Sequence, residues 1–241
     1  MKPLKTIFIL LFVTSALSAQ WGKKIKGNGK IVTIERSTGD YDHIAVSGFF
    51  DVELVPGREG NLALEGEENI LKHIITKVDG RKLIIKMEKG YQINPSSYKK
   101  GVAITVPIDV INSLTCSGSG DITARKIIKT VRFETTMSGS GDVFLDIDAL
   151  SVISSMSGSG DLALKGKTRD LSIKISGSGD VEAYGLVAEN VEAIVSGSAT
   201  INVTATQMID ARVSGSGDID YRGNPKKVTT KVSGSGDITG N

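Results

Sequence analysis

The C-terminal half of the chain alternates apolar and polar positions in a pattern that returns about every 20 residues. Each repeat carries the phrase Ser-Gly-Ser-Gly-Asp, and successive copies lie 18 to 21 residues apart. A period near 20 that holds over seven copies is typical of a solenoid, in which one supersecondary unit stacks on the next. The phrase ends at Asp121, Asp142, Asp161, Asp180, Asp218 and Asp237, with one degenerate copy that ends at Thr200.

Around the phrase, every second position is apolar or small. The residue before it is Cys116, Met137, Met156, Ile175, Val195, Val213 or Val232, and the residue after its Asp is equally apolar. This period of two is expected of strands with one buried face, and no window shows the 3.6-residue spacing of a helical repeat. We therefore predict an all-β solenoid, a β-helix with coils of about 19–20 residues. Parity places the glycines of the phrase toward the core, at a tight corner.

The same parity places both serines and the Asp of each phrase on the outer surface. Coils of a β-helix stack at roughly 4.8 Å, so the repeats predict columns of Ser and Asp along one edge. Neighbouring carboxylates at that spacing repel by about 1 kcal/mol in water, which hydroxyls, backbone N–H groups or a cation would have to offset. One interpretation is that each Asp caps its own turn. The other is a ligand-binding ladder made of Asp121, Asp142, Asp161, Asp180, Asp218 and Asp237.

A metal site is not expected on this ladder. Calcium-binding β-rolls use the pattern G-G-x-G-x-D, whereas the Asp here follows the second Gly directly and occurs once per coil. A hard cation prefers six or more oxygen ligands, which a single column of carboxylates with neutral hydroxyls does not supply. We expect no metal and no cofactor.

The N-terminal segment predicts export. Lys2 and Lys5 precede an apolar run and small residues up to Ala19, which is the layout of a signal peptide over residues 1–19. No Cys lies near the cleavage site, so we expect an exported protein (periplasmic, outer-surface or extracellular) that is not a lipoprotein and keeps no transmembrane segment. Cleavage lowers the 29 basic residues by two, to match the 27 acidic ones, so no nucleic-acid partner is expected. The single Cys116 is interpreted as a buried thiol.

The boundaries of the segments after the signal peptide follow from how regular the repeat is in each. Residues 20–40 are a lead-in, residues 41–112 are irregular β-helix coils with insertions, and residues 113–241 are the regular coils. The irregular part is expected to cap one end of the core. Asp79-Gly80 predicts a hairpin, and residues 67–73 a short helical turn. Residues 91–101 predict a polar protruding loop, with Tyr91 and Tyr98 as candidate partner contacts.

Several phrases resemble a known family. The opening Ile-Ala-Val-Ser-Gly-Phe-Phe-Asp-Val (residues 44–52), the Glu-Asn-Ile-Leu stretch (residues 68–71) and the recurrent Ser-Gly-Ser-Gly-Asp-Ile are similar to the putative auto-transporter adhesin, head-GIN domain family of secreted bacterial proteins. The resemblance covers residues 41–241. It implies a right-handed parallel β-helix distantly like pectin-lyase folds, an origin in the Bacteroidota, and a role in cell adhesion.

Two functions remain open at the level of the sequence. The first is a non-catalytic secreted or surface protein that binds a glycan or a cell-surface protein. The alternative is a polysaccharide-acting enzyme of the pectin-lyase-like type, which we do not expect, because identical repeated Asp residues do not provide the unlike carboxyl pair that acid–base chemistry needs. The last coil exposes Val228, Val232 and Ile238 at an uncovered end, which predicts a homodimer through the C-terminal end of the β-helix.

Overall fold

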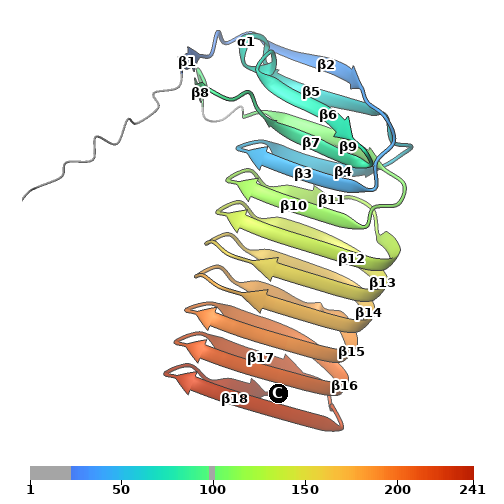
Figure 1. Ribbon diagram of the computed structural model, residues 1–241, viewed down its shortest axis with the longest axis vertical. Helices are drawn as coiled ribbons and strands as arrows, with labels where there is room; N and C mark the ends of the chain where they lie inside the picture. The colour runs from blue at the N-terminus through green and yellow to red at the C-terminus, as the bar shows by residue number, and fades with distance from the viewer. Residues whose placement is uncertain (1–22, 98–100) are drawn as a thin grey trace, which may run out of the picture.

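The computed structural model of the protein describes residues 23–97 and 101–241. It is a stack of flattened coils in two layers, with an irregular cap at its N-terminal end (Figure 1). Neighbouring coils pair in parallel, so the predicted all-β parallel solenoid is confirmed. The predicted signal peptide, residues 1–19, lies outside the described residues.

Each regular coil runs along a back layer, bends, and returns along a front layer to its glycine corner (Figure 1). In the middle coils both runs belong to one long strand, and the bend falls where the register of β13 skips Leu150. The strands of this part are β10 (Ser113–Gly118), β11 (Ile122–Ala124), β12 (Ile128–Gly139), β13 (Val143–Met156), β14 (Leu162–Ile175), β15 (Val181–Gly197), β16 (Thr200–Gly215), β17 (Asp218–Arg222), β18 (Lys227–Gly234) and β19 (Ile238–Gly240).

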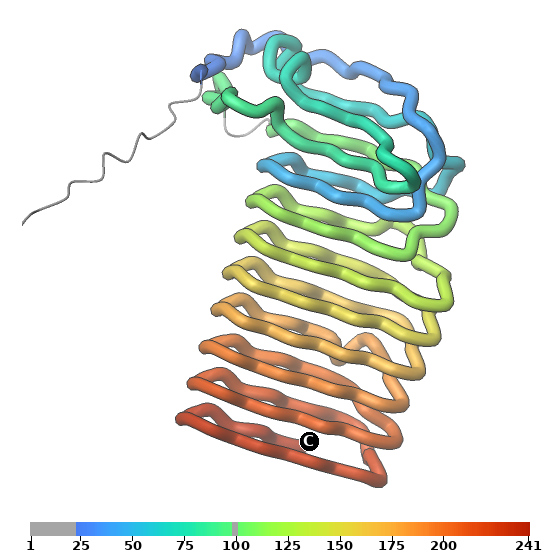
Figure 2. Tube along the Cα trace, in the orientation of Figure 1, coloured from blue at the N-terminus to red at the C-terminus, as the bar shows by residue number. Residues whose placement is uncertain are grey.

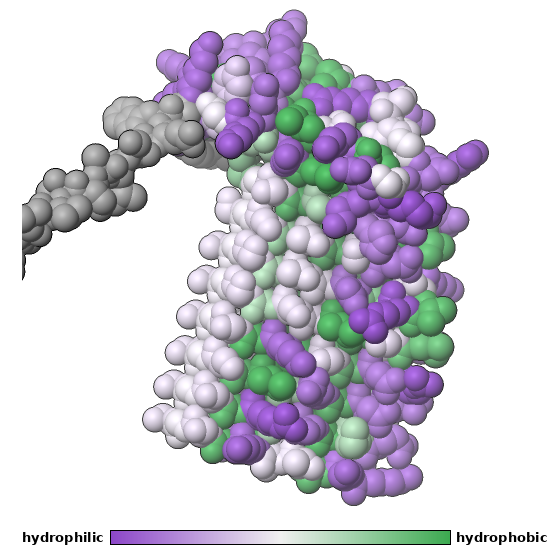
Figure 3. All heavy atoms as spheres, in the orientation of Figure 1, coloured by the Kyte–Doolittle hydropathy of each residue, from purple (hydrophilic) through white to green (hydrophobic). Residues whose placement is uncertain are grey.

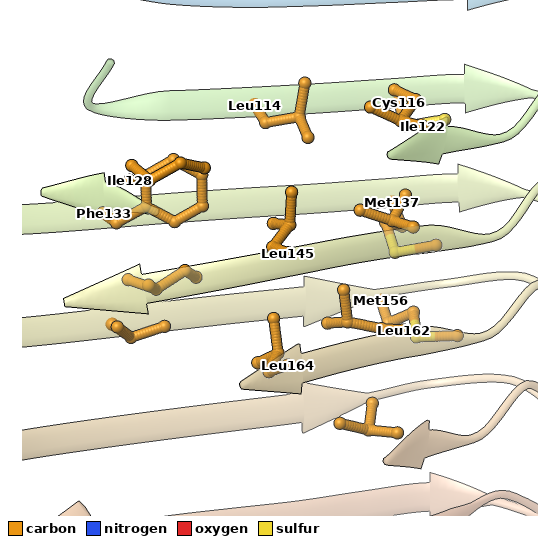
Figure 4. Close-up of a cluster of buried hydrophobic side chains, with 14 of the residues drawn as sticks. Leu114, Cys116, Ile122, Ile128, Phe133, Met137, Leu145, Met156, Leu162 and Leu164 are labelled. Carbon is orange, nitrogen blue, oxygen red and sulfur yellow. The ribbon is translucent and has the colours of Figure 1, made fainter. Parts of the chain in front are cut away.

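The core fills the space between the two layers (Figure 4). The inward positions predicted from parity are buried from β10 to β17, including Cys116, Met137 and Met156. Burial raises the pKa of the Cys116 thiol, in keeping with its predicted role as a small apolar side chain. Two inward residues on adjacent coils are polar: the hydroxyls of Thr135 and Ser154 are buried and have no hydrogen-bond partner among the described residues.

The glycines of the phrase are needed for a second reason beside the predicted one. A Cβ placed on Gly158 would lie 2.1 Å from the carbonyl oxygen of Gly139 in the preceding coil, and one on Gly139 would lie 2.0 Å from that of Gly118. In real proteins a Cβ atom essentially never lies within 3.0 Å of a non-bonded heavy atom. The missing side chains therefore make room for the neighbouring coil along the stack, which produces the tight corners on one edge of Figure 2. The second glycine of the phrase also faces the core, as predicted: a Cβ on Gly179 would lie 2.6 Å from Cε of Met156, and one on Gly217 would lie 2.6 Å from Cγ1 of Val195.

The irregular part changes the order of the coils. Strand β3 (His43–Gly48) pairs directly with β10, His43 with Ser113, although they lie 70 residues apart. The chain between them does not form coils at that point: it passes to the other side of the coil formed by β3 and β4 (Asp51–Pro56) and builds a further coil there. That coil consists of β7 (Lys82–Met87), paired with β3, and β9 (Ala103–Ile108), paired with β4.

Antiparallel strands close this end of the stack. They are β2 (Ile31–Ser37), β5 (Asn61–Glu67) and β6 (Ile74–Asp79), and β6 pairs with β7 through the predicted Asp79-Gly80 hairpin. The predicted helical turn is α1 (Glu68–Leu71). Two short strands, β1 (Lys23–Lys26) and β8 (Tyr91–Asn94), form a separate parallel pair. The pairing of β2 with β5, of β5 with β9 and of β6 with β7 leaves the apolar interior covered, as a solenoid cap requires.

One buried carboxylate fastens the N-terminal lead-in to the cap. The side chain of Glu67, 2% exposed, accepts hydrogen bonds from the N–H groups of Gly29 (2.6 Å) and Ser96 (2.8 Å). Burial alone would raise the pKa of Glu67, but these hydrogen bonds outweigh it and hold the pKa below its ordinary value.

The opposite end of the stack is open. Strand β18 pairs with β16 and β19 with β17, and within the described chain no strand pairs with their outer edges. Val228 and Val232, inward by parity, are 47% and 44% exposed. This end has the unpaired backbone edge and the apolar side chains that the sequence predicted for it.

Candidate functional site

The six predicted Asp residues form one column along the glycine corner. The N–H of Asp142 donates to a carboxylate oxygen of Asp121 (2.9 Å), that of Asp161 to Asp142 (2.9 Å), and that of Asp180 to Asp161 (3.0 Å). Five of the six carboxylates thus cap the turn of the next coil and not their own turn. The carboxylate of Asp237 caps its own turn, as one interpretation predicted, because it accepts from the N–H of Ile238 (2.8 Å). Thr200 interrupts the column, and there the N–H of Asp218 donates to the carbonyl of Ala199 instead.

This geometry gives the Asp column a structural role through one oxygen of each carboxylate. A backbone N–H donor between successive carboxylates offsets part of their repulsion. The second carboxylate oxygens of Asp121, Asp142 and Asp161 have no hydrogen-bond partner within the described residues, so they face solvent beside two exposed columns of Ser. Ligand binding along this ladder stays a prediction.

Of the two tyrosines predicted to contact a partner, only Tyr91 lies within the described residues. Tyr91 does not lie in a protruding loop: it begins β8, is half-buried, and packs on the ring of His73 with ring centroids 4.2 Å apart. His73 in turn shares a 2.8 Å contact with Glu88, so Tyr91 is held on the cap. Tyr98 lies outside the described residues.

A groove of about 680 Å³ lies on the outer face of the front layer. Its floor is a row of residues that the strand register places directly beside one another: Lys82 on β7, His43 on β3, Ser113 on β10 and Glu134 on β12. The turn before the front run of β12 forms one side. The groove is lined by His43, Lys82, Asn112, Ser113, Thr115, Thr130, Val131, Arg132, Glu134 and Thr136.

Most charges near the groove already have partners. Arg132 donates to Glu134 (Nε–Oε1 2.9 Å). His43 Nδ1 lies 2.7 Å from the hydroxyl of Ser113, and its Nε2 lies 3.4 Å from Asp42, whose other oxygen accepts from Arg81 (2.7 Å). Lys82 differs, because its ammonium has no hydrogen bond or ion pair within the described residues.

Hydroxyl side chains continue from the groove toward the glycine corner. Thr115, Thr136 and Ser155 occupy successive outward positions beside the column of first serines, where Ser117 and Ser138 share a 3.0 Å hydrogen bond. In Figure 3 residues of intermediate hydropathy, such as Ser and Thr, form a pale band along the corner and over the upper front face. A rigid array of neutral donors and acceptors suits a hydroxylated ligand.

On the lower front face most polar groups pair with one another, although one buried carboxylate oxygen of Asp210 has no hydrogen-bond partner within the described residues. Asn190 donates to Asp170 (2.8 Å), and Ser172 donates to Glu192 (2.8 Å), which also pairs with Lys174. The hydrogen bond from Asn190 is the main cause that lowers the pKa of Asp170, and the one from Ser172 lowers the pKa of Glu192. The groove differs from it because an ammonium group, that of Lys82, is left there without a partner within the described residues.

The sequence pattern did not single out the groove. Its floor residues come from four strands, of which two precede the regular repeat, so no local motif contains them. The signal lay in the strand register, because each floor residue occupies the same outward position of its coil. In the coils that carry the serine phrase, this position lies four residues before the first serine of the phrase. Within residues 23–97 and 101–241, no cluster of three or more His, Cys, Asp or Glu is placed to hold a metal ion. None of the helices in these ranges is long and apolar enough to cross a membrane.

These features define a parallel β-solenoid with a closed cap, an open end and a polar front face. The chain belongs to the putative auto-transporter adhesin, head GIN domain family, whose model matches residues 40–225. The resemblance seen in the sequence is thereby confirmed.

Solved structures of similar proteins share this fold. One is a putative adhesin from Bacteroides fragilis, 25% identical, with a TM-score of 0.83 over 90% of this chain and 100% of its own. Another is a putative lipid binding protein from Parabacteroides distasonis, 27% identical, with a TM-score of 0.74 over 91% of this chain and 100% of its own. A putative adhesin from the latter species is 21% identical, with a TM-score of 0.72 over 91% and 100%. Among curated proteins, none matches the chain.

The family and these neighbours suggest an adhesion-like role at the cell surface or after secretion. They also suggest binding to surface molecules rather than catalysis.

Proposed function

We propose that the protein is exported by its predicted signal peptide and binds an envelope or cell-surface glycan without catalysing a reaction. The observation that carries this proposal is the groove on the front layer, continuous with a band of Ser and Thr hydroxyls. Its volume is within the usual range of small-ligand sites, about 300–1,000 Å³. Because the groove is built on paired strands, its hydroxyls keep fixed positions before a ligand arrives, which lowers the entropic cost of binding.

A glycan fits this surface better than a lipid. One solved neighbour is described as a putative lipid binding protein, but in this chain the space between the two layers is filled by side chains (Figure 4). The groove on the front layer is open to the outer surface and is lined by several polar residues. A fatty-acyl chain needs enclosed apolar surface to offset its removal from water.

Enzymatic action on a polysaccharide, the alternative, is less well supported. The groove contains one carboxylate, that of Glu134, and it is tied to Arg132. Hydrolysis by two carboxyl groups needs an acid and a base in unlike environments. Incubation with polymeric uronates, followed by measurement of new reducing ends, is expected to show no product.

The binding proposal is tested with the chain from Gln20 onward, labelled and incubated with a fractionated cell envelope. The side chain of Thr115 points outward and lines the groove, so Thr115→Trp should fill the groove and abolish binding without disturbing the core. The matched control is Thr123→Trp, an outward Thr on the back layer of the same coil. Binding should be lost after periodate oxidation of the envelope and kept after protease treatment. Equal binding by both variants, or loss of binding with protease only, would refute the proposal.

The open end forms a second part of the proposal, an end-to-end homodimer. Antiparallel pairing of β18 with its copy, centred on Thr230, sets Val228 opposite the copy's Val232 and each Lys opposite a hydroxyl residue. Such a twofold pairing uses the same edge on both partners and covers the exposed valines.

A further inference from the structure

We infer that the groove binds the acidic unit of a glycan, a uronate or another carboxylated sugar, with the carboxylate at Lys82. The inference rests on the proposed glycan-binding function and adds the chemical class of the ligand. It starts from the charges of the groove and from their position in the row Lys82–His43–Ser113–Glu134.

Lys82 is the uncompensated charge of this row. Glu134 is held by Arg132, and Asp42 behind His43 is held by Arg81, so neither carboxylate is available to Lys82. In the strand register Lys82 lies beside His43, one strand spacing away, which is about 4.8 Å. The carboxylate nearest to Lys82 in the strand register is that of Asp79, opposite it on β6, and this carboxylate pairs with Lys77 (3.8 Å). The only carboxylate among the floor residues, that of Glu134, is three strand spacings away, about 14 Å. An anionic group on a ligand is therefore the natural partner of this ammonium.

The rest of the groove has the chemistry of a sugar site. Thr130 donates to the side-chain oxygen of Asn112 (2.6 Å), which orients the free amide N–H groups of Asn112. The hydroxyls of Thr115 and Thr136 have no partner within the described residues and can donate or accept. Val131, 71% exposed at the side of the groove, offers an apolar surface for the C–H face of a sugar ring.

The ammonium group of Lys82 and the hydroxyl of Ser113 lie along one row across the strands, so a bound glycan would be oriented along that row. A carboxylate at Lys82 places the remaining ring hydroxyls of the same or the next sugar over Ser113 and Thr115. A neutral glycan would make the same hydroxyl contacts and leave Lys82 unused. An acidic peptide could pair with Lys82, but its side chains would find few apolar pockets in a groove lined mainly by polar residues.

The test compares the galacturonate trisaccharide with its methyl ester, which keeps the hydroxyls and removes the charges. Calorimetric titration of the chain from Gln20 should show the acid binding about three- to tenfold more tightly than the ester. Lys82→Gln should remove that difference. Lys86→Gln is the matched control, because Lys86 is an exposed outward Lys on the same strand and does not line the groove. It should leave both affinities unchanged.

The outcomes separate this inference from the proposal beneath it. Equal binding of acid and ester, unchanged by Lys82→Gln but abolished by Thr115→Trp, would overturn the acidic class and leave glycan binding in the groove intact. Binding of the acid that survives Thr115→Trp would overturn the site itself, and no binding of either sugar would overturn the uronate class. Equally tight, Lys82-dependent binding of a glutamate peptide would overturn the choice of a sugar.

Discussion

Replacement of Gly158 by Ala tests the reason for the glycine corners. A Cβ at this position would lie 2.1 Å from the carbonyl oxygen of Gly139, and that oxygen accepts hydrogen bonds from the N–H groups of Ser159 (2.9 Å) and Gly160 (3.3 Å). The methyl group must push the two coils apart at the point where they are joined. Overpacking costs typically 1–3 kcal/mol, and each weakened hydrogen bond about 0.5–1.5 kcal/mol. Together they predict a loss of about 2–6 kcal/mol.

The matched control is Ser159→Ala, one residue along the same corner. The Ser159 side chain is exposed, so its loss should change the free energy of unfolding by less than about 0.5 kcal/mol. Guanidinium unfolding followed by far-UV circular dichroism measures both variants against the parent chain. Equal shifts for Gly158→Ala and Ser159→Ala would refute the close approach of the coils as the reason for glycine at this position.

Three further predictions concern the Asp column, the cap and the open end. Asp161→Ala removes the acceptor for the N–H of Asp180 and should destabilise the chain by about 0.5–1.5 kcal/mol in the same unfolding assay, whereas Asp161→Asn keeps an acceptor oxygen and should lie near the parent. The lowered pKa of Glu67 means that its contribution to stability is full at neutral pH and is lost as the pH falls through the folded-state pKa. The protection of the Gly29 and Ser96 amides against hydrogen exchange, relative to the intrinsic rate at each pH, should therefore fall in acid, and a Glu67→Gln variant should lose this pH dependence. Sedimentation should show dimers of the chain from Gln20 and monomers when Val232 or Ile238 is replaced by Lys; a parent chain that stays monomeric at high concentration would contradict the end-to-end dimer.

The regular coils could be predicted closely because one unit repeats. Parity alone identified the buried faces, since Met137, Met156 and Ile175 stand at the same position of successive coils and all are buried. The crowding of the glycines was predicted in part. Parity placed the second glycine of the phrase toward the core correctly, but it describes inward and outward and not the direction along the stack, so it missed the close approach of the preceding coil. The same limit applies to the Asp column, whose hydrogen bonds run from one coil to the next.

The cap and the groove could not be predicted in the same way. Between β4 and β10 the chain builds the coil of β7 and β9 on the side of β3 that faces away from β10. No local sequence pattern indicates that this coil, although later in the sequence, lies nearer to the capped end than β3 does. The groove depends on that rearrangement, because Lys82 joins His43 and Ser113 only through it. Once the register is known, the three residues are found at one outward position of three adjacent strands.

A crystal structure of the chain from Gln20 with the galacturonate trisaccharide tests the central claim most directly. The account predicts the sugar in the front-face groove, its carboxylate within hydrogen-bonding distance of Lys82 and its hydroxyls on Ser113 and Thr115. A trisaccharide bound along the Asp121–Asp180 column or at the open end beside Val232, with the groove empty, would contradict it.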